Sequence, residues 1–158
     1  MANIFSGSEI VELGVHIEEN GRDFYNALVK KSKHGKAKEI FRFLALEEEK
    51  HIAVFRKILD SVGSYEPPEA YPGEYFAYMN ALASDYVFTK KKTGEAAATK
   101  IASDVEAVDA GIGFEKDSIL FYEGMKKVVP PYDQGVVDEL ISQEQGHLRK
   151  LSDLKAAL

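Results

Sequence analysis

A chain of 158 residues, with 45% hydrophobic and 29% charged residues, has the composition of a globular protein and is long enough to bury a core without stabilising cross-links. Its formal net charge of -6 argues against nucleic acid or an anionic membrane as a principal partner. The absence of cysteine excludes disulfides, iron–sulfur clusters and thiolate zinc sites, so any metal must be held by carboxylates and imidazoles.

The start of the chain, MANIFSGSEI, lacks the basic segment and long apolar run of a secretory signal peptide. No stretch approaches the ~20 apolar residues that span a bilayer. We therefore expect a cytoplasmic protein, without membrane contact, that forms one domain over residues 1–158.

Apolar residues at helical spacing predict four long helices. Their expected bounds are about residues 8–33, 36–62, 103–129 and 133–156. Ser103 and Glu106 form a capping-box pattern at the start of the third helix, and Asp133 is a reasonable N-cap for the fourth. Prolines at residues 67, 68, 72, 130 and 131 lie between these helices, as expected of residues that end them.

The connections within the first and second pairs of helices are short, which predicts two antiparallel helical hairpins. A long crossover, about residues 64–102, joins the hairpins. Within it, GEYFAYMNALASDYVF and GEAAATKIA each predict a short helix. This pattern predicts an all-α, ferritin-like four-helix bundle.

The two predicted hairpins repeat one motif. HIEENGRDFYNAL in the first helix aligns with GFEKDSILFYEGM in the third, which matches Glu18 with Glu115. LEEEKHIAVF in the second helix aligns with SQEQGHLRKL in the fourth, which matches the pair Glu48 and His51 with Glu144 and His147. The second copy has glutamine where Glu47 and Glu49 stand, so we interpret those two as flanking surface charge.

The matched residues also lie on the apolar seams of their helices, at spacings of three and four residues. Four carboxylates that converge in a core cannot all stay ionised without compensating charge. Two divalent cations would neutralise them and leave the histidines neutral as ligands. The predicted ligands are Glu18, Glu48, His51, Glu115, Glu144 and His147. The alternative, surface residues on charged helices, does not explain the repeat or the seam.

Small residues flank the carboxylates of the first and third helices. They are Gly14, Gly21, Gly111 and Ser118. Glycine inside a helix costs ~1 kcal/mol relative to alanine, so their placement predicts room for ions or a small substrate. Tyr25 and Tyr122 lie two turns from Glu18 and Glu115, either as supports of the site or as ordinary core tyrosines. His16 and His34 lie off the seams and are interpreted as surface or loop residues.

The sequence resembles the rubrerythrin-like branch of the ferritin-like di-iron proteins. The residues that carry the resemblance are the two Glu-x-x-His pairs, Glu48 with His51 and Glu144 with His147, and the two glutamates followed by Phe-Tyr, Glu18 and Glu115. The resemblance implies that Glu48 and Glu144 bridge two metals, that Glu18 and Glu115 are terminal ligands, and that each histidine binds one metal. It also implies two iron ions, reaction with hydrogen peroxide or dioxygen, and a homodimer.

The sequence departs from this family pattern in two ways. Rubrerythrins proper carry an additional carboxylate where this chain has Ser118, and a rubredoxin domain with four cysteines, which this chain lacks. Electrons would therefore come from an external donor protein.

These features lead to a hypothesis of an oxidoreductase that reduces peroxide or dioxygen at a non-haem di-iron centre. A second hypothesis is iron binding or storage with ferroxidase chemistry. A third is a structural module whose metal pair, zinc for example, only neutralises the core. Carboxylate and imidazole ligands accept iron, manganese or zinc, so the sequence leaves the metal open.

Overall fold

The computed structural model describes residues 6–63 and 73–158, most of which lie in helices. The four long helices are α1 (Gly7–Lys31), α2 (Gly35–Val62), α5 (Asp104–Met125) and α6 (Pro131–Ala157). The shorter elements are α3 (Gly73–Asp85), α4 (Gly94–Thr99) and the 3-10 turns η1 (Val87–Thr89) and η2 (Lys126–Val128). The described residues contain no strand, and the predicted all-α class is confirmed.

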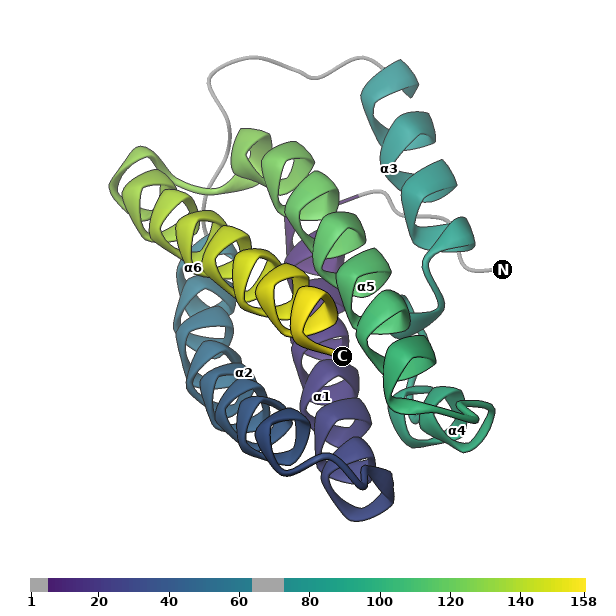
Figure 1. The fold of residues 1–158 in the computed structure, drawn as a ribbon. Coiled ribbons are helices and arrows are strands. Elements are labelled where there is room, and N and C mark those ends of the chain that lie inside the picture. The colour runs from purple at the N-terminus through teal and green to yellow at the C-terminus, as the bar shows by residue number, and fades with distance from the viewer. Residues whose placement is uncertain (1–5, 64–72) are drawn as a thin grey trace.

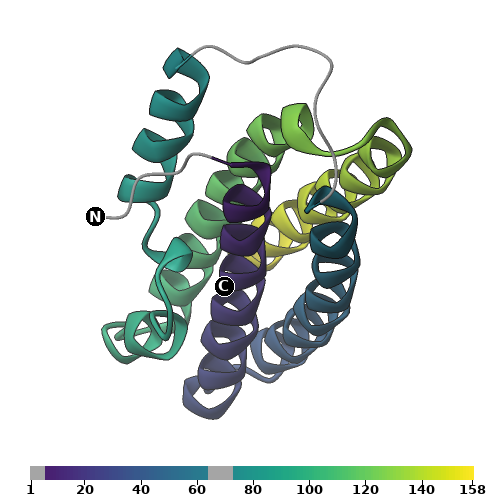
Figure 2. The same ribbon diagram turned by 180° about the vertical axis from the view of Figure 1, so that it is seen from behind.

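The long helices form two antiparallel hairpins, α1 with α2 and α5 with α6, which pack together as a four-helix bundle (Figures 1 and 2). The described part of the crossover, residues 73–102, runs along the outside of the bundle, and Pro67, Pro68 and Pro72 lie outside the described residues. Helix α3 of the crossover lies against α5, and η1 and α4 lie against α1. This is the predicted ferritin-like arrangement of two hairpins joined by one long crossover that contains short helices.

The N-terminal end of α1 is held by a capping box that the sequence analysis missed. Ser6 accepts a hydrogen bond from the backbone N–H of Glu9 at 3.3 Å, and the Glu9 carboxylate accepts one from the N–H of Ser6 at 3.1 Å. The signal was present in the sequence as Ser-x-x-Glu. The helix therefore begins at Gly7, and it ends at Lys31 rather than residue 33 because Ser32 is extended.

The turn between α5 and α6 differs from the expectation. Helix α5 ends at Met125, and the chain tightens into η2 before Pro130 instead of staying α-helical to residue 129. Helix α6 begins at Pro131, and Asp133 lies inside its first turn rather than capping it. Proline suits the first helical position because its missing N–H would have no partner there, and a carboxylate in the first turn favours the helix dipole.

A buried asparagine on α1 fastens the crossover to the bundle. Asn20 Nδ2 donates to the carbonyls of Phe88 at 2.8 Å and Lys90 at 2.6 Å, and Asn20 Oδ1 accepts from the N–H groups of Thr93 and Gly94. Gly94 is required for this close approach, because a Cβ there would lie 2.0 Å from the carbonyl oxygen of Asn20. These bonds hold η1 in one position against α1.

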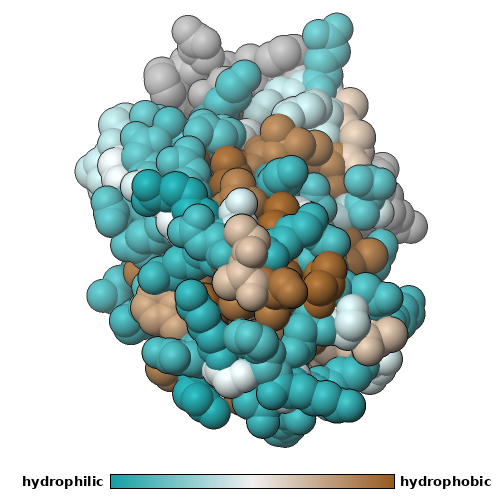
Figure 3. Space-filling model, in the orientation of Figure 1, coloured by the Kyte–Doolittle hydropathy of each residue, from teal (hydrophilic) through white to brown (hydrophobic). Residues whose placement is uncertain are grey.

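The core fills the bundle on both sides of a central polar layer. Large buried side chains on one side include Phe55, Ile58 and Met125, and those on the other include Leu28, Phe41 and Leu151. Apolar side chains are also exposed on the face formed by α5 and α6 (Figure 3), where Leu120 and Val136 are more than a third exposed. None of the helices in the described ranges has the length and apolar character to cross a membrane.

Candidate metal centre

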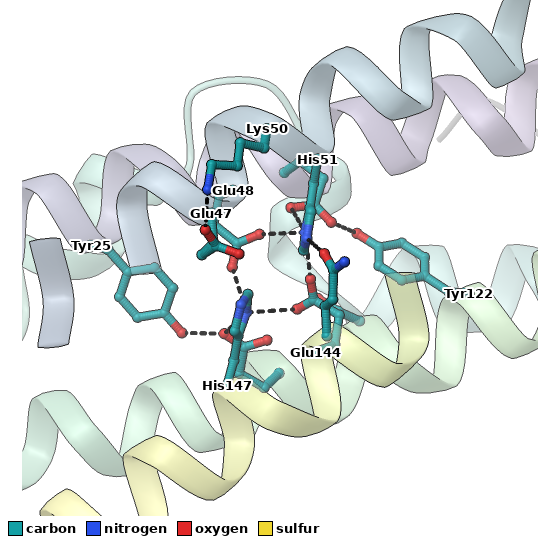
Figure 4. A network of polar contacts seen from close by, with 12 residues as sticks. Tyr25, Glu47, Glu48, Lys50, His51, Tyr122, Glu144 and His147 are labelled. Carbon is teal, nitrogen blue, oxygen red and sulfur yellow. Dashed lines mark hydrogen bonds and ion pairs between the residues drawn. The ribbon is translucent and has the colours of Figure 1, made fainter. Parts of the chain in front are cut away.

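The six predicted ligands meet in the middle of the bundle. All are buried, with at most 3% of each residue exposed. Glu18 comes from α1, Glu48 and His51 from α2, Glu115 from α5, and Glu144 and His147 from α6. A three-residue spacing on a helix turns both side chains to the same face, so each Glu-x-x-His pair points into the bundle (Figure 4).

Ligand atoms of these residues gather in two overlapping groups. One group contains Glu18, Glu48, His51 and Glu144, and the other contains Glu48, Glu115, Glu144 and His147. Within each group the atoms lie within 4.8 Å of one another. Glu48 and Glu144 belong to both groups, which is the geometry expected of carboxylates that bridge two ions. Glu18 and Glu115 belong to one group each, as terminal ligands would.

Both histidines turn Nδ1 toward the carboxylates. His51 Nδ1 lies 2.7 Å from Glu144 and 3.3 Å from Glu48, and His147 Nδ1 lies 3.4 Å from Glu48. The two rings stack with their centroids 5.6 Å apart. On its other side, His51 Nε2 meets Oε1 of Gln143 at 2.7 Å, so Nε2 carries the proton of the neutral ring and Nδ1 keeps its lone pair for a metal.

The two tyrosines support the terminal carboxylates across the bundle. Tyr25 on α1 donates to Glu115 Oε1 on α5 at 2.6 Å, and Tyr122 on α5 donates to Glu18 Oε1 on α1 at 2.6 Å. Burial, followed by the nearby carboxylates, raises the pKa of both hydroxyls well above the usual value, so both stay protonated donors. Each tyrosine therefore contacts the carboxylate of the other hairpin rather than the one on its own helix.

Protons balance the charge of the metal-free cluster. Burial and the neighbouring carboxylates Glu48 and Glu144 raise the pKa of Glu18 well above its usual value, and burial and Glu144 do the same for Glu115. Burial alone would lower the pKa of His51 and His147, but the carboxylates around each ring raise it far above the ordinary value.

The other two carboxylates behave oppositely. Burial would raise the pKa of Glu48 and Glu144, but hydrogen bonds from the neighbouring carboxyl and imidazole groups lower it. In the metal-free site these shifts favour the ionised form of Glu48 and Glu144, the charged form of both imidazoles and the protonated form of Glu18 and Glu115.

Several buried atoms of the cluster make no regular hydrogen bond, and the histidine nitrogens among them meet the carboxylates only as ion pairs. The atoms are Glu18 Oε2, His51 Nδ1, Glu115 Oε2, Glu144 Oε1 and His147 Nδ1. Buried polar atoms are ordinarily hydrogen-bonded, so five such atoms in one place fit a site that binds cations. Two divalent cations would satisfy them with oxygen and nitrogen ligands only, and this donor set fits iron.

The comparisons with known proteins agree with this geometry. The model of the rubrerythrin family matches residues 9–155. The chain belongs to the rubrerythrin family. A crystal structure from Thermotoga maritima, described as a ferritin-like diiron-carboxylate protein, is 29% identical in sequence, with a TM-score of 0.71. That match covers 99% of this chain and 98% of the other. None of the curated proteins matches the chain.

In this rubrerythrin-family protein, Ser118 stands where rubrerythrins proper have an additional carboxylate, and it contacts the crossover. Ser118 is buried, and its hydroxyl shares a hydrogen bond of 2.9 Å with the hydroxyl of Tyr86. The Tyr86 hydroxyl also donates to the carbonyl of Phe114 at 3.0 Å. Helical periodicity does not identify Tyr86, because it describes one helix at a time and does not link the crossover to α5.

The small residues that flank Glu18 and Glu115 have two different roles. Gly21 and Ser118 border a small cavity beside the carboxylates, as predicted. Gly14 and Gly111 instead permit close packing: a Cβ at Gly14 would lie 2.8 Å from the Phe55 ring, and one at Gly111 would lie 3.1 Å from Leu151. The prediction that small residues leave space for ions or a small substrate was therefore wrong for Gly14 and Gly111.

Two residues beside Glu48 and Glu144 also lie close to the histidines. Glu47 is half-buried, and one of its oxygens lies within 4.8 Å of a nitrogen of both histidines, so it is not simply surface charge. Gln143 holds His51. Glu47 and Gln143 occupy matching positions of the repeat, directly before Glu48 and Glu144, and this match could have identified them from the sequence.

The remaining predicted surface residues have structural roles. Glu49 is exposed and pairs with Arg22 at 2.8 Å. His16 Nδ1 lies 3.2 Å from the carbonyl of Thr89, which ties α1 to η1. His34 caps α2, with Nδ1 accepting from the N–H of Ala37.

Proposed function

We propose that this protein is a non-haem di-iron oxidoreductase that reduces hydrogen peroxide or dioxygen with electrons from an external donor. The observation that carries the proposal is the buried set of four carboxylates and two imidazoles, five atoms of which make no regular hydrogen bond. Residues Glu18, Glu48, His51 and Glu144 would hold one ion, and Glu48, Glu115, Glu144 and His147 the other.

When bound, a pair of ferrous ions would supply two electrons, which with two protons convert hydrogen peroxide to two molecules of water by cleavage of the O–O bond. The protein holds the ligands in position and keeps bulk water out of the site. Tyr25 and Tyr122 neutralise part of the charge on Glu115 and Glu18 through their donated hydrogen bonds. Gln143 keeps the His51 ring turned with Nδ1 toward the centre.

The direct test is anaerobic loading with ferrous ion followed by a pulse of hydrogen peroxide, monitored by the near-ultraviolet absorption of ferric ion. We expect oxidation far faster than that of ferrous ion in buffer. Glu144→Ala should lose the fast phase, and Glu49→Ala is the matched control because Glu49 is exposed and paired with Arg22. Oxidation no faster than in buffer would contradict the proposal.

A second candidate function is ferroxidase chemistry that serves iron storage. The observation that favours it is the same buried set of carboxylates and imidazoles, which would bind ferrous ion for either function. Size exclusion and iron stoichiometry separate the candidates. For the oxidoreductase we expect a homodimer with about two irons per chain. The exposed apolar side chains on the face of α5 and α6 support the dimer. A closed shell of many subunits with many irons per chain would favour storage.

A further inference from the structure

One aromatic side chain on α2 joins solvent to a histidine of the metal centre. Phe43 is 39% exposed, and its ring meets the ring of His147 edge-on with a centroid distance of 6.3 Å. On the side of α1 and α5, by contrast, Tyr86 and Phe88 of the crossover cover the small cavity beside the carboxylates and are buried. The face of α2 and α6 therefore gives the centre an aromatic contact with the surface.

Phe43 and a neighbouring leucine form an exposed apolar pair on α2. Leu46 is 61% exposed and follows Phe43 by three residues, which places the two side chains next to each other on the helix. Next to His147 on α6, Gly146 has no side chain, and a Cβ there would meet only the guanidinium of Arg149, at 4.0 Å. Exposed apolar side chains that gather on one face mark surfaces that bind another protein.

Basic side chains border this apolar pair. Lys150 of α6 lies over the Phe43 ring, with Nζ 4.8 Å from the ring centroid. Arg42 precedes Leu46 by four residues and is therefore its neighbour on the surface of α2. Both basic residues are exposed, and among the described residues neither forms an ion pair. The apolar pair thus has uncompensated positive charge on both helices.

Two acidic groups of the same part of α2 are already paired. Glu47 lies 2.6 Å from Lys50, and Glu49 lies 2.8 Å from Arg22. The chain as a whole carries a formal net charge of -6 and repels an acidic protein over most of its surface. Positive charge beside an exposed apolar pair would therefore attract an acidic partner and also fix its orientation.

We propose that Arg42, Phe43, Leu46 and Lys150 form the docking surface of the external electron donor, and that this donor is a small redox protein with an acidic surface. Each docked donor gives one electron. Two reduced donors and two protons convert one hydrogen peroxide to two molecules of water, and two oxidised donors are released. This inference rests on the proposed function, because it names the kind of partner that the function requires.

Binding of an acidic redox protein tests the docking surface without turnover. The probe is a plant-type ferredoxin, an acidic one-electron carrier, in its oxidised form. Calorimetry with the iron-loaded protein should show saturable binding that weakens as salt is added. Arg42→Glu and Lys150→Glu should each weaken this binding by about tenfold. Absent or salt-independent binding to the wild type would overturn the proposal.

A charge reversal elsewhere on α2 is the matched control. Lys57 is exposed on the same helix, about 20 Å along it from Phe43. Lys57→Glu makes the same change in net charge as Arg42→Glu or Lys150→Glu, and it should leave ferredoxin binding unchanged. A loss in Lys57→Glu as large as in the other two variants would show that only net charge matters, and would overturn the proposal.

Electron transfer tests the apolar pair. Reduced ferredoxin should reduce the ferric-loaded protein in anaerobic stopped-flow, and Leu46→Ala should lower the second-order rate by about fivefold. Dithionite is a small reductant that needs no docking surface, so it should reduce the wild type and Leu46→Ala at equal rates. Phe43→Leu keeps an apolar side chain but loses the ring beside His147, so electron transfer at saturating ferredoxin should slow while affinity is kept. Unchanged ferredoxin rates in both variants would contradict the docking surface.

Two further outcomes separate the docking surface from the function and from self-association. If the ferrous-loaded wild type reacts rapidly with hydrogen peroxide while ferredoxin reduces all the variants like the wild type, the docking surface is wrong and the function stands. If the loaded protein reacts with neither peroxide nor dioxygen, the function itself is overturned. If Leu46→Ala converts a homodimer to monomers in size exclusion, the surface binds a second copy of the chain, which would overturn the proposal.

Discussion

The two hairpins supply the same ligand types in the same order but surround the two histidines differently. His51 of the first hairpin meets the neutral amide of Gln143 from the second at 2.7 Å. The carboxylate of Glu47 has an oxygen within 4.8 Å of a nitrogen of both histidines, and Lys50 lies 2.6 Å from that carboxylate. The ligand sets are alike, but the amide of Gln143 contacts His51, so the surroundings of the two predicted metal positions differ.

The ring of Phe43 adds to this difference. It lies edge-on to His147 with a centroid distance of 6.3 Å, and Lys150 lies over its other side. Gln143, the partner of His51, is itself held by Glu139 at 3.0 Å. One histidine is thus covered by an aromatic ring and the other by a chain of polar groups. A repeated motif can therefore produce two sites with unequal affinity.

The largest effect should come from the bridging carboxylates, which the two hairpins share. Glu48→Ala and Glu144→Ala should each remove most of both metals, because each residue belongs to both ligand groups. Glu18→Ala should weaken mainly one position. Metal analysis after ferrous loading measures this, with Glu49→Ala as the control. A loss in Glu49→Ala as large as in Glu48→Ala would contradict the ligand assignment.

The pH dependence of metal affinity tests whether the ligands of both hairpins release protons when metal binds. Glu18 and Glu115 have raised pKa values, and so do both histidines, so protons on these four groups are favoured in the metal-free protein. Loading of divalent ions should therefore release protons. Metal competes with these protons, so affinity should rise as pH rises and fall as pH falls. Calorimetry in buffers of different ionisation enthalpy counts the protons; release of none would contradict this charge balance.

The outer partners of the histidines provide the sharpest test of inequivalence. Gln143→Ala should weaken the metal position of His51 by about 10–100-fold, because the ring loses the partner that fixes its orientation. Glu47→Ala should affect both positions, because one of its oxygens lies within 4.8 Å of a nitrogen of each histidine. Stepwise titration with cobalt(II), followed by visible absorption, resolves the two positions. If Gln143→Ala weakened both steps equally, this partner would not distinguish the two histidines.

The smallest effect is expected from the tyrosines, which are arranged alike in the two halves. Tyr25→Phe and Tyr122→Phe each remove a hydrogen bond of 2.6 Å to a buried carboxyl group. Each should lower the free energy of unfolding of the metal-free protein by about 1–2 kcal/mol. Urea denaturation measures the change. Exposed Tyr132→Phe is the control, and a similar loss there would show that the effect is not specific to the centre.

Much of the fold could be predicted from local sequence pattern. The predicted and observed helices differ mainly at their ends. Apolar spacing predicted the four long helices and the two short ones of the crossover, because a buried face repeats along a single helix. The start of α6 was misplaced because a proline was interpreted only as a stop, although it also suits the first position of a helix. The family and the ferritin-like fold were likewise visible in the two Glu-x-x-His pairs.

The sequence by itself determined which six residues converge, because a repeat on apolar seams selects them without knowledge of how the helices pack. Only the tertiary structure decided which groups support them: Tyr25 reaches Glu115, Gln143 reaches His51, and Tyr86 with Phe88 covers the cavity. These contacts join segments far apart in the chain. Helical periodicity describes only the face of one helix, so the partner that meets that face is set by packing.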